Sequence, residues 1–103
     1  MRLTRREFAA LAAAGKLVFA NPSPPISVKR GPRVKMTIRV SEDDGLTWPT
    51  SRVVHLGPSA YSSLARIPGG QVGLLYEAGR FGAYETIRFA LVSMPWLEQG
   101  REA

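Results

Sequence analysis

The chain has 103 residues with no cysteine, 45% apolar residues, 21% charged residues, ten glycines and eight prolines. This is the composition of a globular chain large enough for one small domain. The lack of cysteine excludes a disulfide scaffold, and one histidine with two aspartates leaves no material for a Ser-His-Asp triad or a His-rich metal cluster. No apolar stretch approaches the roughly 18 residues of a membrane-spanning helix. We therefore expect no membrane span, no metal and no cofactor.

The formal net charge of +6 is unevenly placed along the chain. Residues 1–40 carry nine Lys and Arg against the single acid Glu7, whereas residues 41–103 carry five against seven acids. A nucleic-acid surface combines clustered cations with aromatic side chains, yet residues 1–40 contain only Phe8 and Phe19. We therefore expect no nucleic-acid partner. If the protein is an enzyme, its chemistry must come from Arg, Glu, Tyr or Ser side chains.

The first fifteen residues differ from the rest, because arginines are followed by a phenylalanine and an Ala/Leu-rich run. The segment Thr4-Arg5-Arg6-Glu7-Phe8 resembles a twin-arginine export signal, which a receptor reads as an address. Small residues in Val18-Phe19-Ala20 would suit cleavage before Asn21. We therefore interpret residues 1–20 as the export signal of a periplasmic or extracellular protein. The alternative is an N-terminal amphipathic helix or a remnant of an upstream piece of the fold.

From Lys16 onward, apolar and polar residues alternate, which is typical of β-strands whose successive side chains point to opposite faces. The pattern predicts strands at Leu17–Ala20, Lys35–Ser41, Arg52–Leu56, Ser62–Ile67, Val72–Glu77 and Thr86–Val92. Turn signals separate them at Pro22–Pro25, Asp43–Gly45, Gly57–Pro58 and Pro68–Gly70. Short strands joined by turns, with no helix between them, predict an all-β fold of antiparallel strands.

The octapeptide SEDDGLTW fits the pattern S-x-D-x-G-x-x-W, with its fixed positions at Ser41, Asp43, Gly45 and Trp48. This is an Asp-box, a hairpin turn in which a carboxylate accepts backbone N–H bonds, glycine takes a conformation closed to other residues and an indole packs under the turn. It resembles the turns that recur in sialidase-type propellers, away from the active face. We therefore assign Asp43 a structural role and not a catalytic one, and take Asp44 as a solvated turn residue.

Further segments make the resemblance specific to exo-α-sialidases, the neuraminidases. These segments are Arg33–Thr37 before the Asp-box, Ala60–Leu64, Gly73–Glu77 and Tyr84–Ile87. The order of these segments resembles the order at the C-terminal end of that family. The resemblance covers roughly Leu17–Leu97. The resemblance implies the last one to two blades of a six-bladed β-propeller, with residues 21–103 as the partial propeller.

The resemblance also implies two residues that act on the substrate. A sialic acid carries a carboxylate on its anomeric carbon, which a guanidinium can grip through two parallel N–H bonds. Arg33 matches the third of the family's three arginines; the alternatives are a surface arginine, or Arg30 in its place. Tyr61 matches the family's nucleophile. A neutral phenol suits that role because the substrate carboxylate does not repel it, and sialidases are the tyrosine exception among glycosidases. The alternative for Tyr61 is a packed tyrosine bonded to backbone.

Glu77 ends an apolar strand, and the resemblance implies that it positions the first arginine of the triad. The alternative is a solvated strand-end glutamate. No residue of this sequence matches four other functional residues of the family. These are the first two arginines, the acid/base aspartate and the glutamate that activates the tyrosine. We therefore expect part of an exo-α-sialidase acting on sialylated glycans, inactive as this 103-residue chain alone.

An alternative function is a non-catalytic Asp-box propeller module that binds carbohydrate or protein. Whichever function holds, we expect self-association, since isolated blades leave strand edges and an apolar face uncovered.

Overall fold

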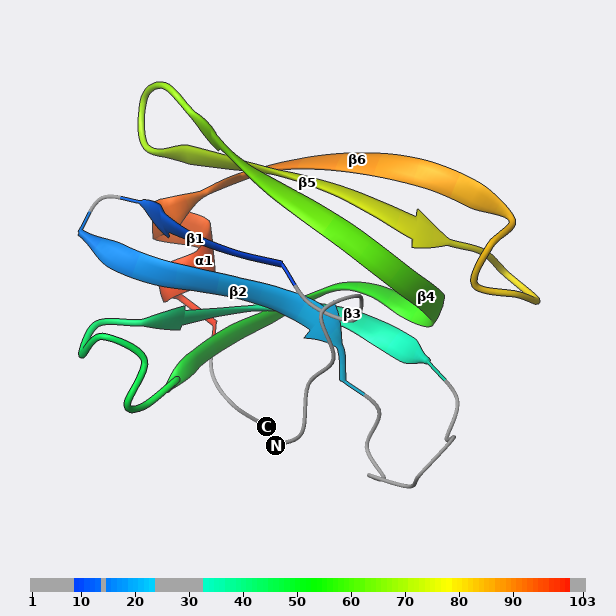
Figure 1. Cartoon of the computed structure of the whole chain (residues 1–103), viewed down its shortest axis with the longest axis horizontal. Helices are drawn as coiled ribbons and strands as arrows, with labels where there is room; N and C mark the ends of the chain where they lie inside the picture. The colour runs from blue at the N-terminus through cyan, green and yellow to red at the C-terminus, as the bar shows by residue number, and fades with distance from the viewer. Residues whose placement is uncertain (1–8, 14, 24–32, 101–103) are drawn as a thin grey trace.

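The computed structural model describes residues 9–13, 15–23 and 33–100. Six strands and one short helix follow one another along the chain (Figure 1). They are β1 (Ala9–Ala13), β2 (Lys16–Pro22), β3 (Val34–Ser41), β4 (Thr50–Ile67), β5 (Gln71–Ala78), β6 (Thr86–Ser93) and α1 (Met94–Glu98). Each strand pairs antiparallel with the next, in the order β1-β2-β3-β4-β5-β6. The prediction of an all-β antiparallel fold is confirmed, and its form is consistent with a fragment of sialidase propeller blades.

Strand β4 is shared by two parts of the sheet. Its first half pairs with β3, from Thr50 to Pro58, and its second half pairs with β5, from Ser59 to Ile67. In Figure 1 the strand runs to the right, bends and returns above itself. The turn predicted at Gly57–Pro58 is therefore wrong. The chain bends there without leaving extended geometry, because an irregular register between Ser59 and Ser62 lets a strand change direction while keeping its partners.

The N-terminal segment gives the second difference from prediction. Residues Ala9–Ala13 form strand β1 on the edge of β2, so the amphipathic helix that was the alternative to an export signal does not form there. Val18 and Ala20, next to the cleavage position predicted before Asn21, are fully buried in β2. Strand pairing outweighs the helix preference of alanine here because it covers an otherwise open edge. Export itself stays a prediction, since residues 1–8 lie outside the described residues.

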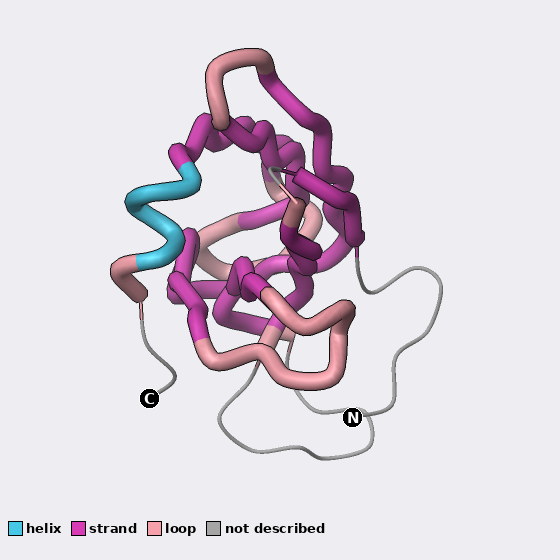
Figure 2. The backbone as a smooth tube through the Cα atoms, turned by 90° about the vertical axis from the view of Figure 1, so that its left-hand side faces the viewer, coloured by secondary structure: helices cyan, strands magenta, loops and turns pink. Residues whose placement is uncertain are grey.

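The core lies between the two parts of the sheet. From one side come Val18, Met36, Ile38 and Val40, and the alternation predicted for β3 places the last three inward as expected. From the other come alternate residues of β5, such as Leu74, with Val92, Met94 and Leu97. Figure 2 shows the strands curling around this interior, with α1 at one side. Burial of apolar surface on both facing layers is what holds such a curled sheet closed.

Helix α1 closes one end of the core. The Ser93 side chain accepts the Trp96 N–H as an N-cap, and Pro95 occupies the first turn, where its missing N–H costs nothing. Leu97 is fully buried. Arg52 of β4 lies over the Trp96 ring, 4.7 Å from its centroid, and its Nε donates to the Trp96 carbonyl at 2.9 Å. Helix α1 is thus packed against β4.

The outer face of β5 and β6 is apolar and exposed. Leu75 lies opposite Phe89 across the two strands, and Ile87 and Leu91 occupy the same face two residues away on either side. Their exposed fractions lie between 47% and 71%. No helix within the described residues is long and apolar enough to cross a membrane. Exposed apolar surface on one sheet face favours packing against another protein surface.

We predict that the 103-residue chain self-associates through this face. Replacing Ile87 and Phe89 with threonine should shift sedimentation-velocity profiles toward monomer, because the apolar surface that drives association is removed. Leu46→Ser is the matched control, since Leu46 is 84% exposed but lies in the turn before β4. A wild-type chain that stays monomeric as its concentration is raised would contradict the prediction.

Candidate functional site

The bend of β4 brings three distant segments together. The Ser59 N–H donates to the Arg33 carbonyl oxygen at 2.9 Å, which ties the bend to the start of β3. One residue earlier, the Pro58 carbonyl accepts the Gly79 N–H at 3.0 Å, which ties the bend to the end of β5. These two backbone bonds place the residue before β3, the segment after the bend and the end of β5 side by side.

The three predicted site residues meet at this point. Tyr61 lies two residues after Ser59, with 37% of its surface exposed. The Arg33 guanidinium lies over the Tyr61 ring, with its Cζ 5.5 Å from the ring centroid. The Tyr61 backbone N–H donates to Glu77 Oε1 at 3.1 Å. Arg33, Tyr61 and Glu77 therefore form one contiguous group, although 44 positions separate the first from the last in the sequence.

Arg33 carries the most informative feature of the group. Its Nη1 is buried and has no hydrogen-bond partner in the described part of the chain. A buried guanidinium nitrogen without a partner is costly, and an anion, a ligand or a water molecule could supply the missing hydrogen bond. The backbone beside it is irregular, because Lys35 has a left-handed φ of 62° and the β3–β4 register shifts on both sides of Met36. Bulges of this kind redirect neighbouring side chains at functional sites.

Glu77 and the Tyr61 hydroxyl have fewer partners than the predicted roles require. Within residues 9–13, 15–23 and 33–100, no cation forms an ion pair with Glu77, and no group hydrogen-bonds to the Tyr61 hydroxyl. The predicted partner of Glu77 is the first arginine of the family's triad, and no residue of this sequence matches that arginine. Arg30, the predicted substitute for Arg33, lies outside the described residues.

Tyr84 is a member of the site that the sequence pattern did not identify. Its ring meets the Tyr61 ring edge-on, with centroids 6.5 Å apart and planes at 74°. The sequence suggested a packing role for Tyr84 and named no partner for it. The signal available in the sequence was the segment Tyr84–Ile87, which carried the resemblance without a role attached to its first residue.

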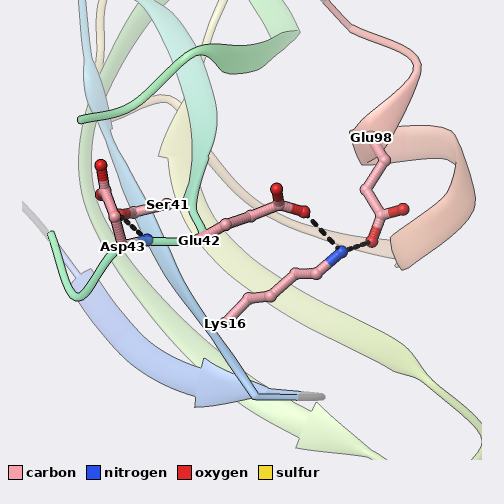
Figure 3. Close-up of polar contacts among 5 residues, drawn as sticks. All are labelled: Lys16, Ser41, Glu42, Asp43 and Glu98. Carbon is pink, nitrogen blue, oxygen red and sulfur yellow. Dashed lines mark hydrogen bonds and ion pairs between the residues drawn. The ribbon is translucent and has the colours of Figure 1, made fainter.

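The Asp-box forms the turn between β3 and β4, as its pattern predicts. The Ser41 hydroxyl donates to Asp43 Oδ1 at 2.8 Å (Figure 3). It also accepts the Gly45 N–H at 2.8 Å. Asp43 Oδ1 also accepts the Thr47 N–H at 2.8 Å. Gly45 has a left-handed φ of 89°, and the Trp48 Nε1–H donates to its carbonyl. The carboxylate is fully used in holding the turn.

The Asp-box lies far from the candidate site. Strand β3 separates Arg33 from Ser41, a distance of about 25 Å at the usual rise of a strand. Lys16 of β2 joins the box to α1, with its Nζ 2.9 Å from Glu42 Oε1 and bonded also to Glu98 (Figure 3). The hydrogen bond that Lys16 donates to Glu98 is the largest cause of the raised pKa of Lys16, followed by the one that it donates to Glu42. This ion pair network ties the box to the helix.

Within the residues that the structure describes, no three His, Asp or Glu side chains lie close enough together to hold a metal ion.

The bonds in the turn predict how stability depends on pH. Hydrogen bonds from the Thr47 side chain and backbone, followed by that of Ser41, lower the pKa of Asp43 from 3.8 to about 2. A lowered folded-state pKa stabilises the fold above the ordinary pKa, and this contribution is lost as the pH falls toward about 2. Asp43→Asn should therefore lower the melting temperature at pH 7 and reduce its dependence on pH between about 4 and 2.

Asp44→Asn is the control for this measurement. Asp44 is exposed and has a left-handed φ of 60°, which asparagine also tolerates. Circular dichroism melts across the pH range compare the two variants with the wild type. Equal melting curves for Asp43→Asn and Asp44→Asn would show that the carboxylate does not hold the turn.

Two sialidases are similar to this chain in sequence. A sialidase from Micromonospora viridifaciens is 42% identical over 86 residues, which is 84% of this chain and 12% of the relative. Sialidase-4 from Homo sapiens is 36% identical over 85 residues, which is 76% of this chain and 16% of the relative. No family model matches the chain. The chain thus spans a small part of the curated relatives that it matches, and the two matches support a C-terminal portion of the sialidase family.

Proposed function

We propose that this chain supplies part of the active site of an exo-α-sialidase, which hydrolyses terminal sialic acids from glycoconjugates. The observation that carries the proposal is the buried, unpartnered Nη1 of Arg33 beside the half-exposed ring of Tyr61. A carboxylate on the substrate would complete the hydrogen bonding of that guanidinium. The same placement would put the anomeric carbon, to which the carboxylate is attached, near a phenol.

The electrostatics of the group favour a tyrosine as nucleophile. An anionic Asp or Glu would be repelled by the substrate carboxylate, whereas the Tyr61 hydroxyl is neutral until a base removes its proton. In the proposed step, Tyr61 Oη bonds to the anomeric carbon while the bond from that carbon to the leaving glycan oxygen breaks. The phenol proton passes to a base and the leaving oxygen gains a proton from an acid, both outside this segment. Water then releases the sugar with retention.

We assign Glu77 a supporting role. By accepting the Tyr61 N–H at 3.1 Å, its carboxylate fixes the backbone that carries the phenol. A carboxylate half-buried at the end of an apolar strand also favours a cationic neighbour. We propose that an arginine from a part of the enzyme beyond this segment takes that place. Turnover therefore requires more than these 103 residues.

Replacing Arg33 tests the carboxylate grip. In a sialidase that contains this segment within a complete propeller, Arg33→Lys should weaken binding of a sialic-acid analogue by about 30-fold to several thousand-fold. An ammonium offers one point charge and no planar fork, so the paired hydrogen bonds are lost. Isothermal titration calorimetry measures the affinity, and Arg66→Lys, an exposed arginine at the far end of β4, is the matched control.

A second ligand makes this test specific. An analogue without the carboxylate should lose much less affinity on Arg33→Lys, because the missing interaction was with that group. Equal losses for both analogues would show that Arg33 supports the fold and does not bind the carboxylate.

Replacing Tyr61 separates an enzyme from a binding module. In the same sialidase, Tyr61→Phe removes the attacking oxygen but keeps the ring that packs against Arg33, so hydrolysis of a fluorogenic sialoside should fall by several orders of magnitude while binding of the analogue changes little. Unchanged hydrolysis would remove Tyr61 from the mechanism. Binding of sialylated glycans without any hydrolysis by the unmodified protein would instead favour a non-catalytic Asp-box module.

A further inference from the structure

The loop between β5 and β6, residues 79–85, is tightly held although its side chains are exposed. Glu85 accepts the backbone N–H groups of Arg80 and Phe81 through its two oxygens, each at 3.0 Å. Gly79 lies so close to the returning chain that a Cβ there would be 2.0 Å from the Gly82 carbonyl oxygen. Only glycine permits this approach, so the loop has a fixed shape.

The base of this loop is fastened to the bend that builds the candidate site. The Gly79 N–H donates to the Pro58 carbonyl at 3.0 Å, and His55 Nε2 lies 3.1 Å from the Gly79 carbonyl oxygen. Both partners belong to β4 on the stretch that leads to Tyr61. The loop is therefore attached to the same stretch of β4 that carries the predicted nucleophile.

From this loop, Tyr84 reaches the predicted nucleophile. It touches the Tyr61 ring edge-on, while the Arg33 guanidinium lies against the same ring. Glu77 holds the Tyr61 backbone but does not restrict the rotation of its side chain. A side chain that is 37% exposed would otherwise rotate between staggered positions, so the two ring contacts restrict it.

We propose that Tyr84 is a positioning residue that holds the Tyr61 ring, and that Glu85 acts through it by fixing the shape of the loop. The effect of this on catalysis rests on the function proposed above, because a nucleophile must be held close to its attack geometry to react efficiently. Phe81 lies on the same loop and is 84% exposed, and no ring of the described residues contacts it. It is therefore the natural control residue.

The first test uses the 103-residue chain and needs no turnover. The aromatic resonances of Tyr61, assigned with Tyr61→Phe, report ring contacts and rotamer averaging in NMR spectra. Tyr84→Leu should shift them and average the Tyr61 rotamer, whereas Tyr84→Phe keeps the ring and should restore the wild-type spectrum. Phe81→Leu should leave the Tyr61 resonances in place. Thermal melts of each variant confirm that the fold is retained.

Glu85 is tested in the same experiment. Glu85→Gln keeps the size of the side chain but turns one acceptor into a donor, which cannot accept the second backbone N–H. Its Tyr61 resonances should move in the same direction as those of Tyr84→Leu. Tyr61 resonances and rotamer populations that are unchanged in Tyr84→Leu would overturn the proposal. Changes in Phe81→Leu as large as those in Tyr84→Leu would also overturn it.

The second test measures catalysis in a sialidase that contains this segment within a complete propeller. Tyr84→Leu should lower kcat by about 2- to 10-fold with little change in KM, as expected for the loss of one aromatic contact. Tyr84→Phe should keep most of the wild-type kcat, and Phe81→Leu should keep all of it. If Tyr61→Phe abolishes turnover but Tyr84→Leu does not lower kcat, the positioning role fails and the proposed function stands. If Tyr61→Phe leaves turnover intact, the proposed function itself fails.

Discussion

The structure depends on the bend in β4. An ordinary hairpin at Gly57–Pro58 would end one strand and begin another, and the two parts of the sheet would be joined only by a loop. Here the backbone stays extended, and its two hydrogen bonds, to the Arg33 carbonyl and from the Gly79 N–H, fasten the bend to β3 and β5. One continuous strand can then pair on both sides and fold the sheet over its own core. The core and the candidate site are both consequences of this geometry.

The two ends of β3 have different roles. At its C-terminal end, the Asp-box uses Ser41, Asp43 and Trp48 to close a turn, and Lys16 connects that turn to α1. At its N-terminal end, an irregular register next to Lys35 brings Arg33 over Tyr61 with a guanidinium nitrogen unpartnered. The hydrogen-bonding groups of the Asp-box turn are thus paired with one another, whereas the Arg33 guanidinium keeps a nitrogen that a ligand could pair.

The two faces of β5 and β6 also differ in exposure. The inner residues of β5 pack into the core, while Leu75 on its outer face, with Phe89 beside it on β6, remains open. A sheet that is apolar on both faces is suited to lie between two other layers. The inner face of the sheet is thus packed in the core, whereas the outer face of β5 and β6 remains exposed and can pack against another layer. This suits a segment of a larger propeller.

The amino-acid sequence by itself determined the strand alternation and the Asp-box, and its resemblance to exo-α-sialidases singled out Arg33, Tyr61 and Glu77 as candidate site residues. Local periodicity and turn chemistry are properties of short segments, so they can be read without a structure. Only the tertiary structure decided that Gly57–Pro58 is a bend and that Ala9–Ala13 is a strand, because both depend on pairing with distant segments. It also decided that Tyr84 touches Tyr61. That contact crosses from one strand to a loop 23 positions later, and only the fastening of β4 to β5 brings the two rings together.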